Sequence, residues 1–127
     1  MDVKAAFLEG KINIPMFMEW PPGSVELGYV TEQNRRKQCI RLMGNIYGNV
    51  DAALRFYWLY AAYLIKLGFI RSKTDPCLFI LKGEDGELNM LALCHVDDTQ
   101  IAGTEEQLDA FKEGLRKRFK IKDLGEM

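Results

Sequence analysis

The chain has 127 residues, a length that fits one domain large enough to bury a core. Hydrophobic residues make up 48% of it and charged residues 28%, and the net charge of −1 gives no argument from the chain as a whole for a nucleic-acid partner. Cys39, Cys77 and Cys94 lack metal-ligand spacing, which indicates buried thiols in a reducing compartment. No signal peptide is visible and the longest apolar stretch, 56–65, is too short to cross a bilayer, so we expect a soluble protein.

The first twenty residues predict a short helix followed by a strand. Residues 5–8 favour a helix that Gly10 ends, and Asp2 stands where an N-cap would lie. Residues 12–20 are apolar and rich in strand formers, with Met16-Phe17-Met18 the best strand among them. Two prolines and a glycine then end this run.

A polar connection with weak structural signals covers residues 24–37. It ends in the basic cluster Arg35-Arg36-Lys37, which is typical of a solvated loop and also suits a phosphate contact. Residues 39–42 alternate between polar and apolar side chains. We therefore predict a loop that leads into one short strand.

The clearest predicted element is a helix over residues 51–67. Its apolar positions recur at helical spacing and predict a stripe that faces the core. These positions are Ala53, Phe56 or Tyr57, Tyr60, Tyr63 or Leu64, and Leu67. Asn49 or Asp51 would cap the start of this helix, and Gly68 is a good residue for its end.

Strands and tight turns are predicted from residue 75 to residue 103. Residues 75–81 read as a turn followed by a strand, and 83–86 as a hairpin loop. Two further β-prone runs, 90–94 and 99–102, predict an antiparallel pair with Asp97 and Asp98 at or near the turn between them.

Adjacent carboxylates such as Asp97 and Asp98 repel each other unless a positive charge lies beside them. A hard divalent cation is the usual counter-charge, because Mg²⁺ prefers carboxylate oxygen. The alternative is a solvated turn that happens to contain two aspartates. The residues alone leave both interpretations open.

Residues 104–121 predict a second helix and an edge strand. Thr104 and Gln107 suit a capping box, and Leu108, Phe111 and Leu115 form a core stripe. The basic residues that follow, up to residue 122, suit the C-terminal end of a helix dipole. Residues 119–121 alternate like an edge strand. The order of elements predicts a mixed α+β fold, with an antiparallel sheet and two packed helices.

Six short motifs, in order along the whole chain, resemble those of the reverse transcriptases of copia-type LTR retrotransposons. They are D-V-K-A-A-F-L-E-G at 2–10, M-E-W-P-P-G at 18–23, I-Y-G at 46–48, L-G-F and D-P-C-L-F within 67–79, H-V-D-D with I-A-G within 95–103, and F-K-I-K-D-L-G at 119–125. Each motif is weak alone, but the ordered set is specific. The resemblance implies a palm-like antiparallel sheet and one partial reverse transcriptase domain over 1–127, a palm with part of the fingers and no second domain.

The resemblance also implies a chemistry, which is RNA-directed DNA synthesis. Such enzymes join a primer 3′ oxygen to the α-phosphate of a nucleotide with two Mg²⁺ ions about 4 Å apart, and Mn²⁺ can substitute. By the motif match, Asp2 and Asp97 would be the main metal ligands and Asp98 a supporting acid. Backbone N–H groups of Ala5 and Ala6 would bind triphosphate oxygens.

Two aromatic positions also acquire roles by resemblance. Phe7 would stack against the nucleotide sugar and reject ribonucleotides, whereas without the motifs it reads as a core aromatic. His95 stands where the family usually has Tyr, and it would face the primer end or be a structural histidine. The family commonly has Gln after its L-Y-G motif, whereas this chain continues Val50-Asp51, and an acid there is unfavourable for triphosphate binding.

The partners implied are an RNA or DNA template with its primer, deoxynucleoside triphosphates, and the remaining polyprotein domains (fingers, thumb and RNase H), without a membrane. The implied location is cytoplasmic, in retrotransposon particles. Both ends look cut relative to the family, so we expect a palm-centred fragment that is inactive on its own. Two alternatives remain: a non-catalytic remnant with weak nucleic-acid binding, and another metal-dependent nucleotidyl enzyme such as a cyclase.

Overall fold

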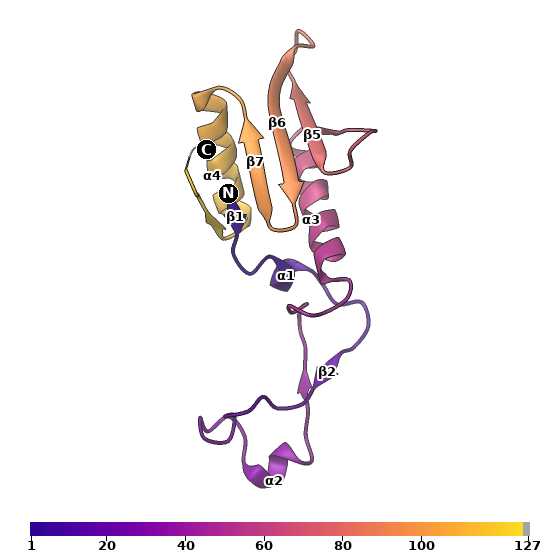
Figure 1. The fold of residues 1–127 in the computed structure, drawn as a ribbon, viewed down its shortest axis with the longest axis vertical. Coiled ribbons are helices and arrows are strands. Elements are labelled where there is room, and N and C mark those ends of the chain that lie inside the picture. The colour runs from indigo at the N-terminus through magenta and orange to yellow at the C-terminus, as the bar shows by residue number, and fades with distance from the viewer. Residues whose placement is uncertain (126–127) are drawn as a thin grey trace.

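The computed structural model describes residues 1–125 and shows an elongated molecule with a body and a projecting arm (Figure 1). The arm, residues 12–43, contains β2, α2 and β3, and the body contains every other element. The elements are β1 (Asp2–Val3), α1 (Ala6–Glu9), β2 (Phe17–Met18), α2 (Glu32–Arg35), β3 (Ile40–Arg41), α3 (Ala52–Lys66), β4 (Ile70–Arg71), β5 (Leu78–Lys82), β6 (Leu88–His95), β7 (Asp98–Ala102), α4 (Glu105–Arg118) and β8 (Ile121–Lys122).

A six-stranded sheet in the order β4-β5-β6-β7-β1-β8 forms the body, and all its neighbouring strands are antiparallel. The first strand of the chain, β1, therefore lies between two strands from the C-terminal third. This confirms the predicted α+β class, the antiparallel sheet and the edge strand near residue 121. No helix among residues 1–125 is long and apolar enough to span a membrane.

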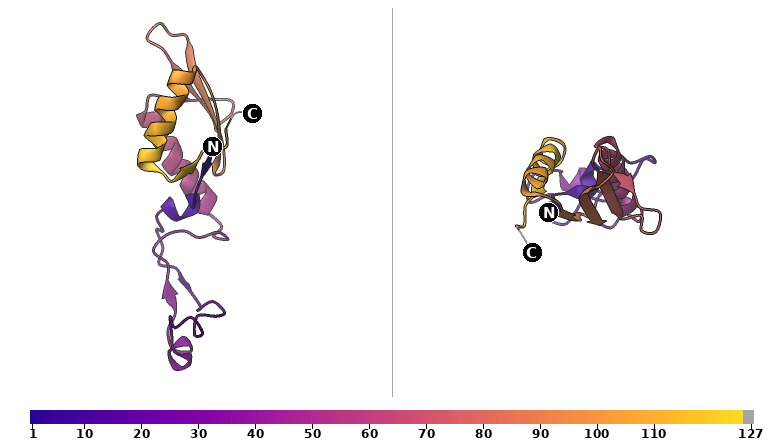
Figure 2. Two further views of the ribbon diagram at one scale, coloured as in Figure 1. Left: turned by 90° about the vertical axis from the view of Figure 1, so that its left-hand side faces the viewer. Right: turned by 90° about the horizontal axis from the view of Figure 1, so that it is seen from above.

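The helices α3 and α4 lie on the same face of the sheet (Figure 2). Alternation along the strands directs Phe79 of β5 and Met90, Ala92 and Cys94 of β6 to this face, where all four are buried. Phe56, Tyr60 and Leu64 of α3 and Phe111 and Leu115 of α4 pack in the same core cluster. Among residues 1–125 no helix covers the other face of the sheet, so side chains on that face are accessible.

Both long helices end with local motifs that the sequence encodes. Thr104 and Gln107 form the predicted capping box at the start of α4. At the end of α3 the amide of Phe69 donates to the Leu64 carbonyl and that of Gly68 to Ile65, which is the Schellman pattern, with Gly68 at φ 94°.

The buried stripe of α3 differs from the predicted one at its two ends. Ala52 and Ala61 are buried with the aromatic residues, whereas Ala53 and Leu67 are exposed. The buried positions are thus shifted by one residue at the start of the helix, from Ala53 to Ala52. Its aromatic residues Phe56 and Tyr60 occupy the core, as predicted.

Two predicted caps are wrong. Asp2 lies in β1 and does not cap α1, which begins after Ala5 without a side-chain hydrogen bond at its start. Asp51 precedes α3 but makes no capping bond, because its carboxylate pairs with Arg55 one turn further on. Asn49 contributes its backbone carbonyl, not its side chain, to Ala52.

The arm contains one helix that the sequence did not predict. Phe17 and Met18 pair with Arg41 and Ile40, which confirms a strand at each predicted place, although both are only two residues long. Between them, Thr31 caps the short helix α2 by accepting a hydrogen bond from the Asn34 amide. This helix is polar all round, so it has no apolar period to reveal it.

Candidate active site

The predicted acidic pair lies at a tight turn between β6 and β7. His95 and Asp98 are cross-strand partners, so Val96 and Asp97 form a two-residue turn. Val96 has φ 55°, which is a strained left-handed conformation for a β-branched side chain. Such a conformation costs about 1–3 kcal/mol and is commonly retained at functional turns.

Asp2 lies directly opposite Asp98, because β1 pairs with the start of β7. Met1 and Thr99 exchange two backbone hydrogen bonds of 2.8 Å, and the Val3 amide donates to the Asp97 carbonyl at 3.0 Å. Asp2 and Asp98 are therefore the non-hydrogen-bonded pair between these bonds. Side chains of such a pair lie on the same face, with Cβ atoms about 5 Å apart.

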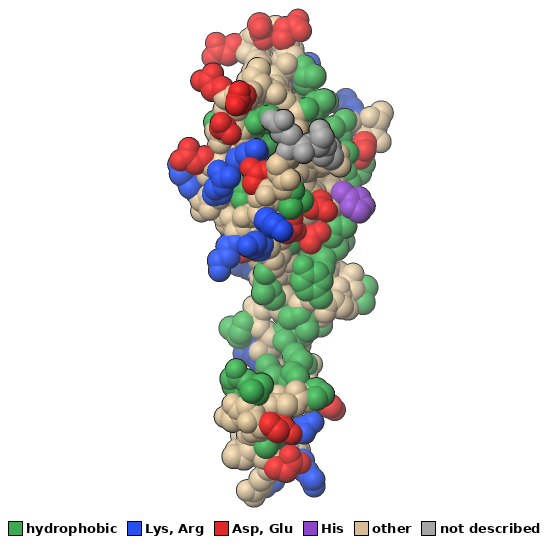
Figure 3. Space-filling view, turned by 60° about the vertical axis from the view of Figure 1, so that its left-hand side comes forward, with side chains coloured by type: hydrophobic (Ala, Val, Ile, Leu, Met, Phe, Trp, Pro, Cys, Tyr) green, Lys and Arg blue, Asp and Glu red, His purple; other side chains and the backbone are tan. Residues whose placement is uncertain are grey.

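The two carboxylates face away from the helices. Thr99, the neighbour of Asp98, is buried, so alternation directs Asp98 to the open face of the sheet. On that face one row crosses four strands in register and contains His95, Asp98, Asp2 and Lys122. Figure 3 shows the histidine of the chain beside acidic side chains, with a group of basic side chains next to them. We call these four residues the acid row.

The acids of the row are of the ligand type that a hard divalent cation prefers. Within residues 1–125, no hydrogen bond or ion pair is formed by the side chains of Asp2, Asp97 or Asp98. Carboxylate oxygens without partners are the ligands that Mg²⁺ and Mn²⁺ prefer. The described part of the chain holds no ready-made group of three metal-ligating side chains. Of the three predicted acids, the structure brings two together as cross-strand partners, Asp2 and Asp98. The third, Asp97, lies next to them in the turn.

The predicted nucleotide-binding residues follow β1 directly. Ala5 is exposed and has φ 54°, and Ala6 is fully buried at the first position of α1, a helix of four residues. Phe7 is half-buried at the edge of the core, and its ring lies 4.5 Å from that of Tyr47, centroid to centroid. Phe7 is therefore neither a fully buried core residue nor a free side chain.

Two other predicted positions are also located by the structure. His95 is exposed at the end of β6, where its register partner is Asp98. Asp51 does not present a free charge, because it pairs with Arg55, whose guanidinium also donates to the Lys11 carbonyl. The unfavourable acid expected near a triphosphate is therefore neutralised within its own helix.

A buried hydrogen bond supports the acid row from the helix side. The hydroxyl of Thr99 donates to the Tyr60 oxygen at 3.0 Å and so ties β7 to α3. Burial raises the pKa of the Tyr60 phenol, and the Thr99 bond offsets part of that rise. Burial likewise raises the pKa of the Cys94 thiol to about 12. Both groups are therefore neutral at physiological pH.

Sequence reasoning did not identify Thr99, Tyr60 or Lys122 as neighbours of the site. The sequence predicted the strands that contain Thr99 and precede Lys122, but not which strands pair. Pairing of β1 with both β7 and β8 joins opposite ends of the chain, and no local pattern signals it. Only the motif resemblance placed Asp2 near Asp97 and Asp98.

Comparison with known proteins identifies the family. Residues 1–127 match the family described as reverse transcriptase (RNA-dependent DNA polymerase). The chain is 29% identical over 126 residues to a retrovirus-related Pol polyprotein from transposon TNT 1-94 of Nicotiana tabacum, covering 98% of the chain and 9% of that protein. It is 32% identical over 124 residues to the retrovirus-related Pol polyprotein from transposon RE2 of Arabidopsis thaliana, covering 97% of the chain and 8% of that protein.

A third relative, the retrovirus-related Pol polyprotein from transposon RE1 of Arabidopsis thaliana, is 30% identical over 128 residues, covering 100% of the chain and 8% of that protein. No solved structure matches the chain significantly. The chain spans less than a tenth of the length of these relatives. The family match confirms the resemblance carried by the ordered motifs, and the chain belongs to the reverse transcriptase (RNA-dependent DNA polymerase) family.

Proposed function

We propose that this chain is the palm of an RNA-directed DNA polymerase, in which Asp2, Asp97 and Asp98 hold divalent cations for nucleotidyl transfer. The observation that carries the proposal is the pairing of Asp2 with Asp98 on the open face of the sheet, beside a turn that contributes Asp97. When bound, two Mg²⁺ or Mn²⁺ ions would activate the primer 3′ oxygen and stabilise the leaving pyrophosphate.

The protein would contribute fixed positions for its acids. Backbone hydrogen bonds on both sides of the Asp2–Asp98 pair hold β1 against β7, and the Thr99–Tyr60 bond holds β7 against α3. Carboxylates fixed in this way do not have to reorganise when cation and substrate bind, which is where enzymes gain most of their electrostatic advantage. Asp2 and Asp97 are the proposed main ligands, and Asp98 supports them.

Segments that flank β1 are proposed to contact the nucleotide. The backbone amides of Ala5 and Ala6 would donate to phosphate oxygens, and Phe7 would lie beside the sugar. The contact between the Phe7 and Tyr47 rings supports this role, because it fixes the orientation of a ring that is half exposed. His95 shares the acid row and would face the primer end.

Template–primer, deoxynucleoside triphosphates and the other polyprotein domains are the proposed partners, and cytoplasmic retrotransposon particles the proposed location. The chain matches 8–9% of each relative, so we propose that most groups that position template and nucleotide lie outside it. Positioning supplies a large part of the catalytic effect. Residues 1–127 alone should therefore extend primers poorly or not at all.

Primer extension by residues 1–127 beside a longer reading frame tests the proposal. An RNA-templated DNA primer should be extended by the longer protein with Mg²⁺, and extension should be lost in its Asp97→Asn variant. Extension that survives Asp97→Asn would contradict the assignment of the acids. A longer protein that folds, binds the template–primer and extends nothing would leave a non-catalytic remnant as the function. Robust extension by residues 1–127 would contradict the proposed dependence on other segments.

A further inference from the structure

A basic pocket lies at the junction of α1, α4 and β8, next to the acid row. It has a volume of about 510 Å³, and five cations and a single acid line it. Its charged residues are Lys4, Glu9, Arg116, Lys117, Arg118 and Lys120. We call this the α4–β8 pocket.

Helix electrostatics explain only part of this charge. Arg116, Lys117 and Arg118 occupy the last turn of α4, where cations offset the negative end of the helix dipole. Lys4 follows β1 and Lys120 precedes β8, so neither belongs to the helix. The Lys4 amide donates to the Lys120 carbonyl at 2.7 Å, which holds these two lysines on neighbouring segments.

Acids neutralise some of the surrounding cations but leave these two lysines unpaired. Arg118 pairs with Glu9 at 3.3 Å and lies over the Phe119 ring. Nearby, the Asp123 carboxylate accepts a hydrogen bond from the Lys112 ammonium group at 2.9 Å. This bond lowers the pKa of the Asp123 carboxyl. Within residues 1–125, neither Lys4 nor Lys120 forms an ion pair. Like charges gathered in a concave surface raise the local potential and attract anions.

We propose that the α4–β8 pocket binds the sugar-phosphate backbone of a nucleic-acid strand, with Lys4 and Lys120 as its phosphate contacts. The inference rests on the proposed function in one respect: a primer end at the acid row would bring its strand to the neighbouring surface. β8, the edge strand, pairs with β1, so the pocket adjoins the strand that carries Asp2. The binding itself requires neither metal nor nucleotide.

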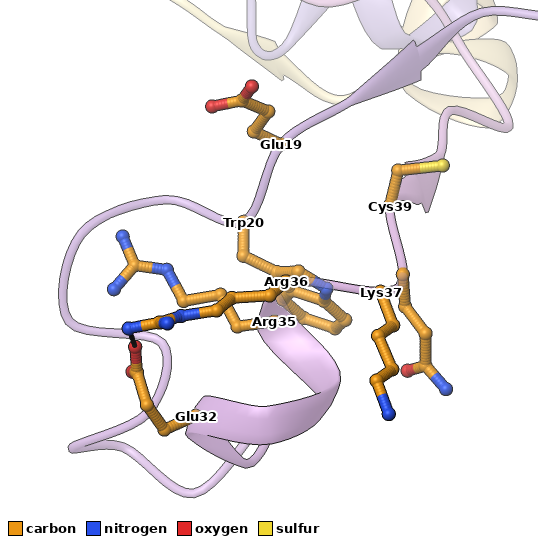
Figure 4. A pocket seen from close by; sticks show the side chains of 8 residues that line it. Glu19, Trp20, Glu32, Arg35, Arg36, Lys37 and Cys39 are labelled. Carbon is orange, nitrogen blue, oxygen red and sulfur yellow. Dashed lines mark hydrogen bonds and ion pairs between the residues drawn. The ribbon is translucent and has the colours of Figure 1, made fainter.

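The basic cluster of the arm is a weaker candidate for the same ligand. Figure 4 shows Arg35, Arg36 and Lys37 around Trp20, with Arg36 directed to Glu32. Glu19 lines the same pocket, so two acids stand among three cations. The arm cluster therefore has a smaller excess of positive charge than the α4–β8 pocket, and it serves as a matched control.

The test measures how the affinity for a fluorescein-labelled RNA–DNA hybrid duplex depends on salt, in chelator and without nucleotide. The variant Lys4→Gln/Lys120→Gln removes two unpaired cations without orphaning an acid. Each phosphate contact releases about one counterion, so the slope of log affinity against log salt should become shallower by about two. The affinity near 0.1 M salt should fall by roughly tenfold for each lysine. Lys4→Arg/Lys120→Arg should restore both quantities, which separates charge from folding.

Arg35→Gln/Lys37→Gln removes the same charge from the arm and should leave the slope nearly unchanged. If the arm variant instead shows the loss and the pocket variant does not, the proposal is wrong. It is also wrong if polyglutamate competes as well as nucleic acid of equal charge, because the surface would then recognise acidic peptides. Asp98→Asn should bind the duplex at least as tightly as the wild type. Binding that persists while primer extension fails in the longer protein would contradict the proposed function and leave this site in place.

Discussion

Asp2 is the cross-strand partner of Asp98, although the two residues come from opposite ends of the sequence. Two carboxylates about 5 Å apart in water repel each other by roughly 1 kcal/mol. A divalent cation would convert that repulsion into attraction. The pair is therefore a natural binding position, and its occupancy can be measured directly.

Asp97→Asn should weaken Mn²⁺ binding to the isolated chain at least several-fold, as followed by the paramagnetic signal of free Mn²⁺ during titration. The amide removes one negative charge beside the Asp2–Asp98 pair and replaces a carboxylate oxygen with a poorer ligand. Asp109→Asn, on the exposed surface of α4, removes an equal charge away from the acid row and is the control. Equal affinity in wild type and Asp97→Asn would remove Asp97 from the metal site.

Lys122→Met should have the opposite effect and tighten Mn²⁺ binding by about three- to tenfold at low salt. Lys122 is the register partner of Asp2 on β8, so its charge opposes a cation bound at the acid row. The gain should shrink in high salt because the lysine is exposed and therefore screened.

Lys82→Met is the matched control for Lys122→Met. Lys82 is an exposed strand residue paired with Leu88, seven positions from His95 along β6, or about 23 Å. Its removal should change Mn²⁺ affinity little. Weaker binding in Lys122→Met would instead mean that this lysine organises the acids. Without metal, Lys122→Met should melt at a lower temperature than Lys82→Met, because the repelling Asp2–Asp98 pair loses the cation beside it in the acid row.

Phe7→Val should raise ribonucleotide incorporation selectively in the longer polymerase. A ring beside the sugar excludes a 2′-hydroxyl by collision, which is a repulsive route to specificity. The measurement is the ratio of ribonucleotide to deoxynucleotide incorporation efficiency. If both substrates lose efficiency equally, or if the melting temperature of the chain falls by more than a few degrees, Phe7 serves packing against Tyr47 and the core.

The chain should lose stability above about pH 9, where unfolded thiols and then phenols ionise. Burial raises the pKa of Cys94 to about 12 and that of Tyr60 above its usual value, so the folded state keeps protons that the unfolded state releases. Stability therefore falls as pH rises. Each group contributes a fall of about 1.4 kcal/mol per pH unit between its pKa in the unfolded state and its raised pKa in the folded state. Urea unfolding at several alkaline pH values measures this slope.

Cys94→Ala should remove one group from that slope, and thiol alkylation provides an independent check. Cys94 is buried as predicted, whereas Cys39 is exposed and that prediction is wrong. Iodoacetamide at neutral pH should therefore modify Cys39 first and leave Cys94 intact until the protein unfolds. Rapid modification of Cys94 in the folded chain would show that the core around β6 opens readily.

Local signals explain which features the sequence could predict. The capping box of α4, the Gly68 terminus of α3 and the hairpin at residues 83–86 depend on neighbouring residues, and each appears where predicted. The acid turn was also visible, because two β-prone runs flank Asp97. The four-residue helix α2 was not predictable, because a short polar helix contains no apolar residues that recur at helical spacing.

Pairing between strands that are distant in sequence explains most of the features that the sequence could not predict. Aspartate is a residue type that suits an N-cap, but Asp2 lies in a strand. A single sequence does not distinguish these two roles until the strands that pair with Asp2 are known. The role of Lys122 as the neighbour of Asp2 was hidden for the same reason. Ala5 adopts φ 54° although alanine usually avoids it, because the chain must leave the sheet at Lys4 and enter α1 within two residues.

The position of β1 between β7 and β8 also has a consequence for the order of folding. The hairpins of β4, β5, β6 and β7 join near neighbours and can form early, whereas β1 must wait for segments about a hundred residues further along the chain. Closing so long a loop carries a large entropy penalty before any contact compensates for it. On a ribosome, Asp2 would emerge well before Asp98 and yet reach it among the last contacts. Premature termination or proteolysis within α4 would remove β8 and leave β1, the strand that carries Asp2, paired with a neighbour on one side only.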